Sequence, residues 1–257
     1  MDPFENQHLE CLSSARSWVE EFVEEGVDAF DPPSIRSPNP IEVRQPLPDQ
    51  IPEASSAPVE PLKTTPPPVS LETVQDELGD CQRCDLCKGR RHIVFGEGNP
   101  HADILFIGEG PGQQEDEQGL PFVGRSGELL TQMIEKGMGI PRSETYICNI
   151  VKCRPPNNRN PLPEEASACR PFLDQQIRAV APKVIVTLGK PAASLLLDHE
   201  VAITRIRGTW QDYEGIPLMP TFHPAYVLRQ YTAENRRAVW EDLKAALARS
   251  RDPEAQT

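Results

Sequence analysis

A short apolar segment followed by a glycine-rich turn is the feature that most constrains the fold. Within residues 103–127, DILFIGEGPGQQEDEQGLPFVGRSG, the apolar run Ile104–Ile107 ends abruptly at Gly108-Glu-Gly-Pro-Gly112. A continuous apolar run closed by turn formers is typical of a strand buried in a parallel sheet. Glycine allows a sharp turn or a close approach of a ligand to the backbone. Phe122 lies just beyond this turn among glycines, where an aromatic ring is better placed to line a pocket than to fill the core.

The remaining chain repeats the alternation of strands and helices. We expect three more strands over residues 145–151, 184–188 and 216–222, and a further short one over 93–95. Helices are expected over 126–138 with Ser126 as the cap, from Pro163 with a kink near Ser167 caused by Pro171, over 192–197 and over 233–248. This order predicts an α/β fold with a central, mainly parallel four-stranded sheet flanked by helices.

Chemically distinctive residues follow each of the four main strands. In parallel sheets, ligands bind beyond the carboxyl ends of the strands. Four residues occupy such positions: Glu109, Asn149, Lys190 and His223. An amide within an apolar strand is costly unless it is paired, so Asn149 is a candidate for reading a ligand edge. His223 alone is equally compatible with a structural, hydrogen-bonded histidine. Together the four positions predict a cleft.

The N-terminal part differs in composition from the rest. The pattern of residues 1–30 predicts a short amphipathic helix. Its residues 6–30 either pack against the rest of the same protein or dock on a partner protein. Residues 31–70 contain 12 prolines and predict a disordered linker. We expect a globular domain over 71–250 and a frayed tail over 251–257.

The overall charge does not exclude a nucleic-acid partner. The chain has 257 residues and a formal charge of −13, but residues 1–70 carry −9 of it, so the remainder can still present a basic face. No apolar run is long enough to span a membrane, and no signal peptide is evident. We therefore expect a cytoplasmic protein without a membrane partner.

The seven cysteines are more typical of thiols or metal ligands than of disulfides in such a chain. Cys81-x2-Cys84 and Cys153-x15-Cys169 can form one metal centre only if the fold brings them together. Zinc and an iron–sulfur cluster both suit such ligands. Cys148 and Cys11 are interpreted as inert thiols, and the role of Cys87 stays open.

A dinucleotide site is not favoured by the glycines. Their spacing is G-x-G-x-G rather than G-x-G-x-x-G, a proline lies within it, and we expect no helix immediately after it.

Four motifs together resemble the family 4 uracil-DNA glycosylases, the iron–sulfur members of that superfamily. They are GEGPG at 108–112, LPFVGR at 120–125, ICNIVKCRPP at 147–156 and TFHP at 221–224. The resemblance covers about residues 75–248 and does not cover 1–70. It implies a repair enzyme that hydrolyses the N-glycosidic bond between uracil and deoxyribose in DNA, releasing uracil and leaving an abasic site.

The resemblance also implies roles for individual residues. A [4Fe-4S] cluster would be held by Cys81, Cys84, Cys153 and Cys169, with Cys87 left out. Phe122 would stack on uracil, Asn149 would hydrogen-bond its edge, and Gly110 would belong to the same substrate site. His223 would act at the uracil carbonyl oxygen, Glu109 matches the acidic position of the motif, and Glu115 would oppose a thymine methyl group. Glu109 is interpreted either as the residue that positions water or as an exposed structural glutamate. Pro171, beside Cys169, departs from the family pattern. The loop 155–161 has no histidine that could capture uracil-containing DNA covalently, so we expect the protein to turn over its substrate.

Contacts with DNA are inferred from position. Val227 or Leu228 would fill the gap left by the extruded base, and Arg229 would meet a phosphate. We expect a monomer in the prokaryotic cytosol or nucleoid that acts on single- or double-stranded uracil-containing DNA, with a possible protein partner through residues 6–30. The alternatives are a non-catalytic iron–sulfur module that binds DNA or a polymerase, and a zinc-binding scaffold.

Overall fold

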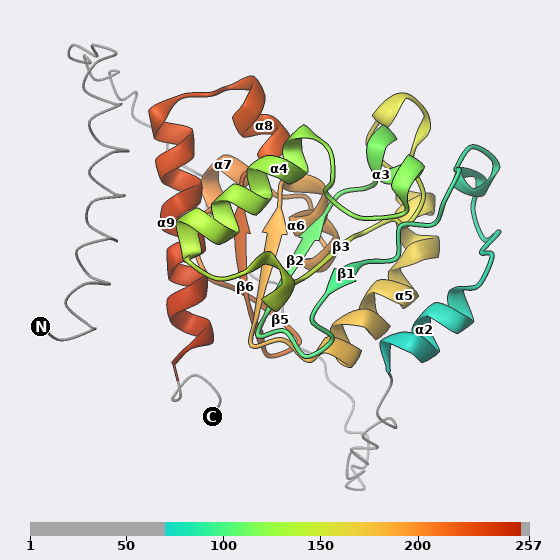
Figure 1. Cartoon of the computed structure of the whole chain (residues 1–257), viewed down its shortest axis with the longest axis horizontal. Coiled ribbons are helices and arrows are strands. Elements are labelled where there is room, and N and C mark those ends of the chain that lie inside the picture. The colour runs from blue at the N-terminus through green and yellow to red at the C-terminus, as the bar shows by residue number, and fades with distance from the viewer. Residues whose placement is uncertain (1–69, 253–257) are drawn as a thin grey trace, which may run out of the picture. The chain divides into compact units, whose positions relative to one another are not determined.

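The computed structural model describes residues 70–252, which build one mixed sheet surrounded by helices (Figure 1). The predicted N-terminal helix, nearly all of the proline-rich linker and most of the tail lie outside the described residues. The strands are β1 (Glu97–Gly98), β2 (Ile104–Gly108), β3 (Tyr146–Asn149), β4 (Val184–Leu188), β5 (Gln211–Tyr213) and β6 (Ile216–Thr221). Their order across the sheet is β1-β3-β2-β4-β6-β5.

The predicted four-stranded parallel sheet forms the centre of the observed one. β3, β2, β4 and β6 are mutually parallel, while the short edge strands β1 and β5 pair antiparallel to β3 and β6. These two edge strands were not predicted, because they are only two and three residues long and carry no apolar run. The strand predicted over 93–95 was wrong: Val94 and Phe95 are buried there, outside any strand.

Helices cover both faces of the sheet. The longer ones are α2 (Leu71–Leu78), α4 (Arg125–Gln132), α5 (Pro163–Val180) and α9 (Ala233–Ser250). The shorter ones are α3 (Gln113–Gln118), α6 (Lys190–Leu196), α7 (Ile203–Ile206) and α8 (Pro224–Arg229). Short 3₁₀ turns occur at η1 (Asp85–Lys88), η3 (Arg142–Glu144) and η4 (Pro156–Asn158). The π-helix η2 (Met133–Met138) follows α4 directly. None of the described helices is long and apolar enough to cross a bilayer.

Alternation along β2 divides the core into two layers. Ile104 and Phe106 pack with residues of α4, η2 and α9, whereas Leu105 and Ile107 pack with residues of α5 and α6. Successive side chains of a strand point to opposite faces, so each layer receives alternate residues. In Figure 1, α9 and α5 accordingly lie at opposite sides of the central strands.

Two local predictions need correction, and one helix was not predicted. α3 begins at Gln113 directly after Gly112, so a helix does follow the glycine motif at once. The cap of α4 is Gly124 rather than Ser126. α5 runs through Pro171 to Val180 as one continuous helix, and the kink near Ser167 stays a prediction. α8 was not predicted; Pro224 occupies its first position, where the missing N–H of proline costs nothing.

The strand register brings the carboxyl ends of the central strands to one edge. Gly108 at the end of β2 lies opposite Asn149 at the end of β3, and Leu188 of β4 lies opposite Thr221 of β6. The glycine motif, Asn149, Gly189-Lys190 and His223 therefore emerge at the same side of the sheet, as predicted. Lys190 itself forms an ion pair with Glu200.

Candidate active site

Phe122 and Asn149 converge on the backbone of Gly108. A Cβ atom at Gly108 would lie 2.4 Å from Asn149 Oδ1 and 2.5 Å from Phe122 Cζ. Such distances are far below van der Waals contact, so only glycine fits between the two side chains. Gly108, Phe122 and Asn149 belong to three separate segments that span at most 41 positions of the sequence. Together they form one small site at the carboxyl ends of β2 and β3.

The backbone of Phe122 is held in an unusual conformation. Its φ angle is +51°, in the left-handed region that bulky residues rarely adopt, and its side chain is only 6% exposed. Gly127 makes room for it, because a Cβ there would lie 1.9 Å from Phe122 O. Backbone conformations of this kind persist where the surroundings enforce them, and they cluster at ligand sites.

Glu115 supplies much of that enforcement. Its buried carboxylate accepts hydrogen bonds from the backbone N–H groups of Gly112 (3.1 Å), Val123 (3.0 Å) and Gly124 (2.8 Å). One side chain therefore joins the glycine turn to the loop that carries Phe122. The sequence suggested Glu115 as the group that opposes a thymine methyl; its observed contacts are with the backbone, and the steric role stays a prediction.

His223 lies close to Phe122. The two ring centroids are 5.7 Å apart with an interplanar angle of 32°. His223 Nδ1 accepts a hydrogen bond from Ala225 N at 3.1 Å. Burial, reinforced by the nearby Arg229 charge, lowers the pKa of His223 to about 4. The ring is therefore neutral at pH 7, and with Nδ1 accepting, its proton resides on Nε2, which is left as a donor.

Asn149 has an unused acceptor. The residue is 1% exposed, and its Oδ1 has no hydrogen-bond partner within the described residues. Buried polar atoms are nearly always paired, so an orphan acceptor beside Phe122 is a mark of a ligand position.

Glu109 is half-buried directly after β2. Burial raises the pKa of its carboxyl group, and the charge of Arg229 opposes this rise. Gly110 follows it, and a Cβ at that position would lie 2.9 Å from Val151 Cγ2. The glycine is thus explained by packing, and its predicted contact with substrate stays a prediction.

The two residues proposed to fill the gap behind an extruded base lie in different surroundings on α8. Val227 is fully buried and packs in the core with residues of α9, so it cannot reach a ligand without unfolding α8. Leu228 is partly exposed and Arg229 is exposed. The structure thus argues against Val227 and leaves Leu228 and Arg229 as candidates.

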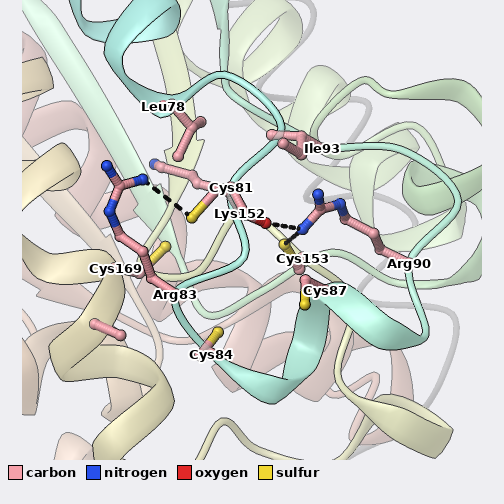
Figure 2. Close-up of a pocket in the computed structure, with 11 residues that line it drawn as sticks. Leu78, Cys81, Arg83, Cys84, Cys87, Arg90, Ile93, Lys152, Cys153 and Cys169 are labelled. Carbon is pink, nitrogen blue, oxygen red and sulfur yellow. Dashed lines mark hydrogen bonds between the residues drawn. The ribbon is translucent and has the colours of Figure 1, made fainter.

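The four predicted cysteine ligands come together. Cys81, Cys84, Cys153 and Cys169 line one pocket with Cys87 (Figure 2), although 68 residues separate the two pairs in sequence. Cys148 is buried elsewhere in the core. All six described cysteines are free thiols, as the composition predicted.

Cations surround the pocket. Arg83 Nη1 donates to Cys81 Sγ and Arg90 Nη1 donates to Cys153 Sγ, each at 3.4 Å, from opposite sides in Figure 2. Burial raises the pKa of Cys153 to about 11, while Arg90 acts in the opposite direction. Apart from their proximity to the cysteines, no sequence pattern pointed to these arginines.

The donor set fits a cluster better than a single ion. Within residues 70–252, no three His, Cys, Asp or Glu side chains lie close enough together to hold one metal ion. An iron–sulfur cluster is larger than one ion, so its thiolate ligands stand further apart around it. Five cysteines line the common pocket, enough to supply the four thiolates of Cys₄ ligation of such a cluster.

Comparison with known proteins identifies the family. The model of the uracil DNA glycosylase superfamily matches residues 95–244. The chain belongs to this superfamily. A type-4 uracil-DNA glycosylase of Thermotoga maritima is 49% identical over 178 residues, which cover 68% of this chain and 92% of that protein.

Two further relatives place the chain among the type-4 members. The type-4 uracil-DNA glycosylase of Sulfurisphaera tokodaii is 44% identical over 68% of this chain and 82% of its own length. That of Saccharolobus solfataricus is 43% identical over 68% of this chain and 84% of its own length. The site of Phe122, Asn149 and His223 lies within the stretch matched by the superfamily model, as do Cys153 and Cys169 of the cysteine pocket. Cys81, Cys84 and Cys87 precede that stretch.

Proposed function

We propose that this protein is a uracil-DNA glycosylase of DNA repair, which hydrolyses the bond between uracil N1 and deoxyribose C1′. The observation that carries this proposal is the convergence of Phe122, Asn149 and His223, with the buried Asn149 Oδ1 left without a partner. The type-4 relatives support the same activity. Mere binding of DNA would not require an orphan amide beside a neutral histidine, so a non-catalytic module is not favoured.

Recognition begins with extrusion of the base, because the glycosidic bond is not accessible within a duplex. The ring of Phe122 offers a stacking surface, and stacking on an aromatic is worth about 1–3 kcal/mol per base. Asn149 Oδ1 accepts from uracil N3–H, and its amide N–H donates to uracil O4. Cytosine reverses both groups, so it would leave buried polar groups unpaired and is rejected.

His223 stabilises the leaving group. Departure of uracil places negative charge on the base, and a positioned donor is worth most at the atom where charge develops. The neutral imidazole donates from Nε2 to uracil O2, since its Nδ1 is occupied by Ala225 N–H. Because burial and Arg229 keep the ring neutral, this step needs no histidinium.

Glu109 is the candidate for positioning the attacking water. It lies after β2 at the same sheet edge as Asn149, and burial raises the pKa of its carboxyl group. A carboxylate at this place can accept a hydrogen bond from water and hold it near C1′. Arg229, which is close enough to influence the pKa of both Glu109 and His223, can meet a flanking phosphate.

We further propose that Cys81, Cys84, Cys153 and Cys169 hold a [4Fe-4S] cluster. When bound, the cluster would supply iron–thiolate bonds that join the segment before β1 to the loop after β3 and to α5. Arg83 and Arg90 would hydrogen-bond its ligand sulfurs, as they do the thiols in the structure. Such bonds to sulfur tune the properties of these centres.

The test is cleavage by alkali of oligonucleotides incubated with the purified protein. Matched single- and double-stranded substrates would carry uracil, thymine or cytosine at one position. We expect strand breaks only with uracil, together with free uracil in solution. His223→Ala should lower the rate by about 10²- to 10³-fold, the usual cost of removing a donor to developing charge. His101→Ala, at an exposed histidine, is the control. Intact uracil strands with the wild type would refute the proposal.

A further inference from the structure

Lys152 is a buried cation placed between the cysteine pocket and the substrate site. Its side chain is 1% exposed, and it lines the cysteine pocket (Figure 2). Its Nζ donates a hydrogen bond of 2.7 Å to the backbone O of Asn149. Lys152 therefore contacts Asn149, whose amide faces the ligand position, and also lines the pocket that contains the cysteines.

No carboxylate pairs with this ammonium group. Among the ion pairs of residues 70–252, none includes Lys152. An isolated buried charge is very unfavourable, so an anion is expected nearby. The available candidates are sulfur atoms. The pocket that Lys152 lines is also lined by Cys81, Cys84, Cys153 and Cys169.

We propose that Lys152 is a positioning residue that couples the cysteine-bound cluster to the uracil-reading amide. Its ammonium takes its counter-charge from the ligand thiolates of the cluster and fixes the carbonyl of Asn149. This inference rests on the proposed function. The inference extends the proposed function, because it explains how the cluster can affect base recognition without electron transfer.

The coupling has a clear physical consequence. With the thiolates bound to iron, the buried ammonium is compensated and the end of β3 is held in place. When the cluster is lost, the ammonium either draws water into the core or leaves its position, and the Asn149 carbonyl loses its donor. Loss of the cluster then impairs uracil recognition through Asn149, even though Phe122 and His223 stand on other segments.

The first test measures the charge and uses no activity. Lys152→Met keeps a similar length without the ammonium. Removing a cation beside an anionic cluster disfavours the added electron, so the midpoint potential of the cluster should shift downward. Lys183→Met is the control, because Lys183 pairs with Asp103 at the surface. An unchanged potential in Lys152→Met would overturn the proposal. If that variant yields no folded protein, Lys152→Gln, which keeps a donor without charge, must show the same downward shift.

The second test measures whether Lys152 acts through Asn149. Single-turnover release of uracil is compared in the wild type, Lys152→Met, Asn149→Ala and the double variant. Lys152→Met should lower the rate by about 10- to 100-fold, as outer partners of metal ligands do. In the Asn149→Ala background the same change should cost little, since the amide it positions is gone. Fully additive losses would show an independent structural effect and overturn the coupling.

The two proposals fail in different ways. If the wild type releases no uracil, the proposed function fails while the potential still tests the charge of Lys152. If fresh wild-type protein holds no iron, the proposed cluster fails, and this inference falls with it, although uracil release is tested separately. The wild type can also release uracil and hold iron while Lys152→Met and Lys183→Met have the same midpoint potential and the same rate. In that case only the role of Lys152 is refuted.

Discussion

The neutral state of the His223 imidazole results from the local environment of its ring. Its ring packs between Phe122 and the start of α8, its Nδ1 is occupied by Ala225 N–H, and Arg229 adds a positive charge nearby. Each of these contacts disfavours a second proton on the ring. The chemistry proposed for His223, donation from Nε2 without prior protonation, follows from this environment.

The lowered pKa of His223 predicts a pH dependence of stability. The pKa is about 4 in the folded protein against an ordinary value of about 6.5 in the unfolded chain. Between these values the unfolded state binds the extra proton, so this contribution to stability is complete above about pH 6.5 and is lost as the pH falls toward 4. Thermal unfolding of the wild type and His223→Gln from pH 7.5 to 4.5 measures it. The wild type should lose more stability on acidification than the variant; parallel losses would contradict the assignment.

At the scale of elements, the segment from α3 to α4 is organised around one carboxylate. Glu115 lies on α3, yet it binds the turn before that helix and the loop after it. Gly108 has no Cβ and so leaves room for the ring of Phe122, and Gly127 in the same way leaves room for its backbone. The stacking surface is thus built from four positions spread over twenty residues.

Glu115→Gln should therefore reduce both stability and activity. The amide keeps one acceptor oxygen but cannot accept all three backbone N–H groups as a carboxylate does. Hydrogen bonds to a buried charged group are worth about 1.5–3 kcal/mol, so we expect the free energy of unfolding to fall by about that amount. Denaturant unfolding and uracil release measure the two effects. Glu117→Gln is the control, since its pair with Arg91 lies near the surface and contributes little. Equal behaviour of the two variants would contradict this role.

Helix α8 separates a core residue from a surface residue at adjacent positions. Val227→Ala should cost about 1.5–3 kcal/mol of stability, the contribution of a buried valine. Leu228→Ala should leave stability nearly unchanged and lower uracil release more from double-stranded than from single-stranded DNA, because only a duplex leaves a gap to fill. Denaturant unfolding and release from both substrates check this. Equal losses on the two substrates would exclude Leu228 from that role.

The same elements show what the sequence can predict. The central strands were predictable because their apolar runs are long and end at turn formers. β1 and β5 were not, because an edge strand of two or three residues is defined by its pairing with a neighbour. The short helix α3 was missed because it is polar and its apolar neighbours lie outside it. Phe122, Asn149 and His223 were found from their chemistry, whereas Glu115 as a backbone acceptor and Lys152 as a buried cation depend on contacts that no sequence pattern records.

At the scale of the molecule, the cysteine pocket connects segments from three parts of the chain. Cys81 and Cys84 follow α2, Cys153 follows β3 and Cys169 lies within α5. Pro171 does not break α5, and Cys169, the fourth proposed ligand, lines the pocket despite the departure from the family pattern. A cluster at this site would bind only the folded arrangement and would therefore stabilise it.

Cys153→Ala should remove the visible iron–sulfur absorbance and lower the soluble yield. Cys87→Ala is the matched control, because Cys87 lines the same pocket but is not one of the four proposed ligands. Absorbance spectra, iron content and yield of the two variants decide the ligand set. A soluble, colourless and fully active Cys153→Ala would contradict the structural role of the cluster, and loss of colour in Cys87→Ala would revise the ligands.

The claim that everything else depends on is that one buried amide reads the extruded base. The most direct measurement is single-turnover uracil release by Asn149→Ala beside Cys148→Ala, which alters the preceding buried residue of β3. Two lost hydrogen bonds at about 1–1.5 kcal/mol each predict a rate about a hundredfold lower for Asn149→Ala. Cys148→Ala should stay close to the wild type. Wild-type release by Asn149→Ala would contradict the account.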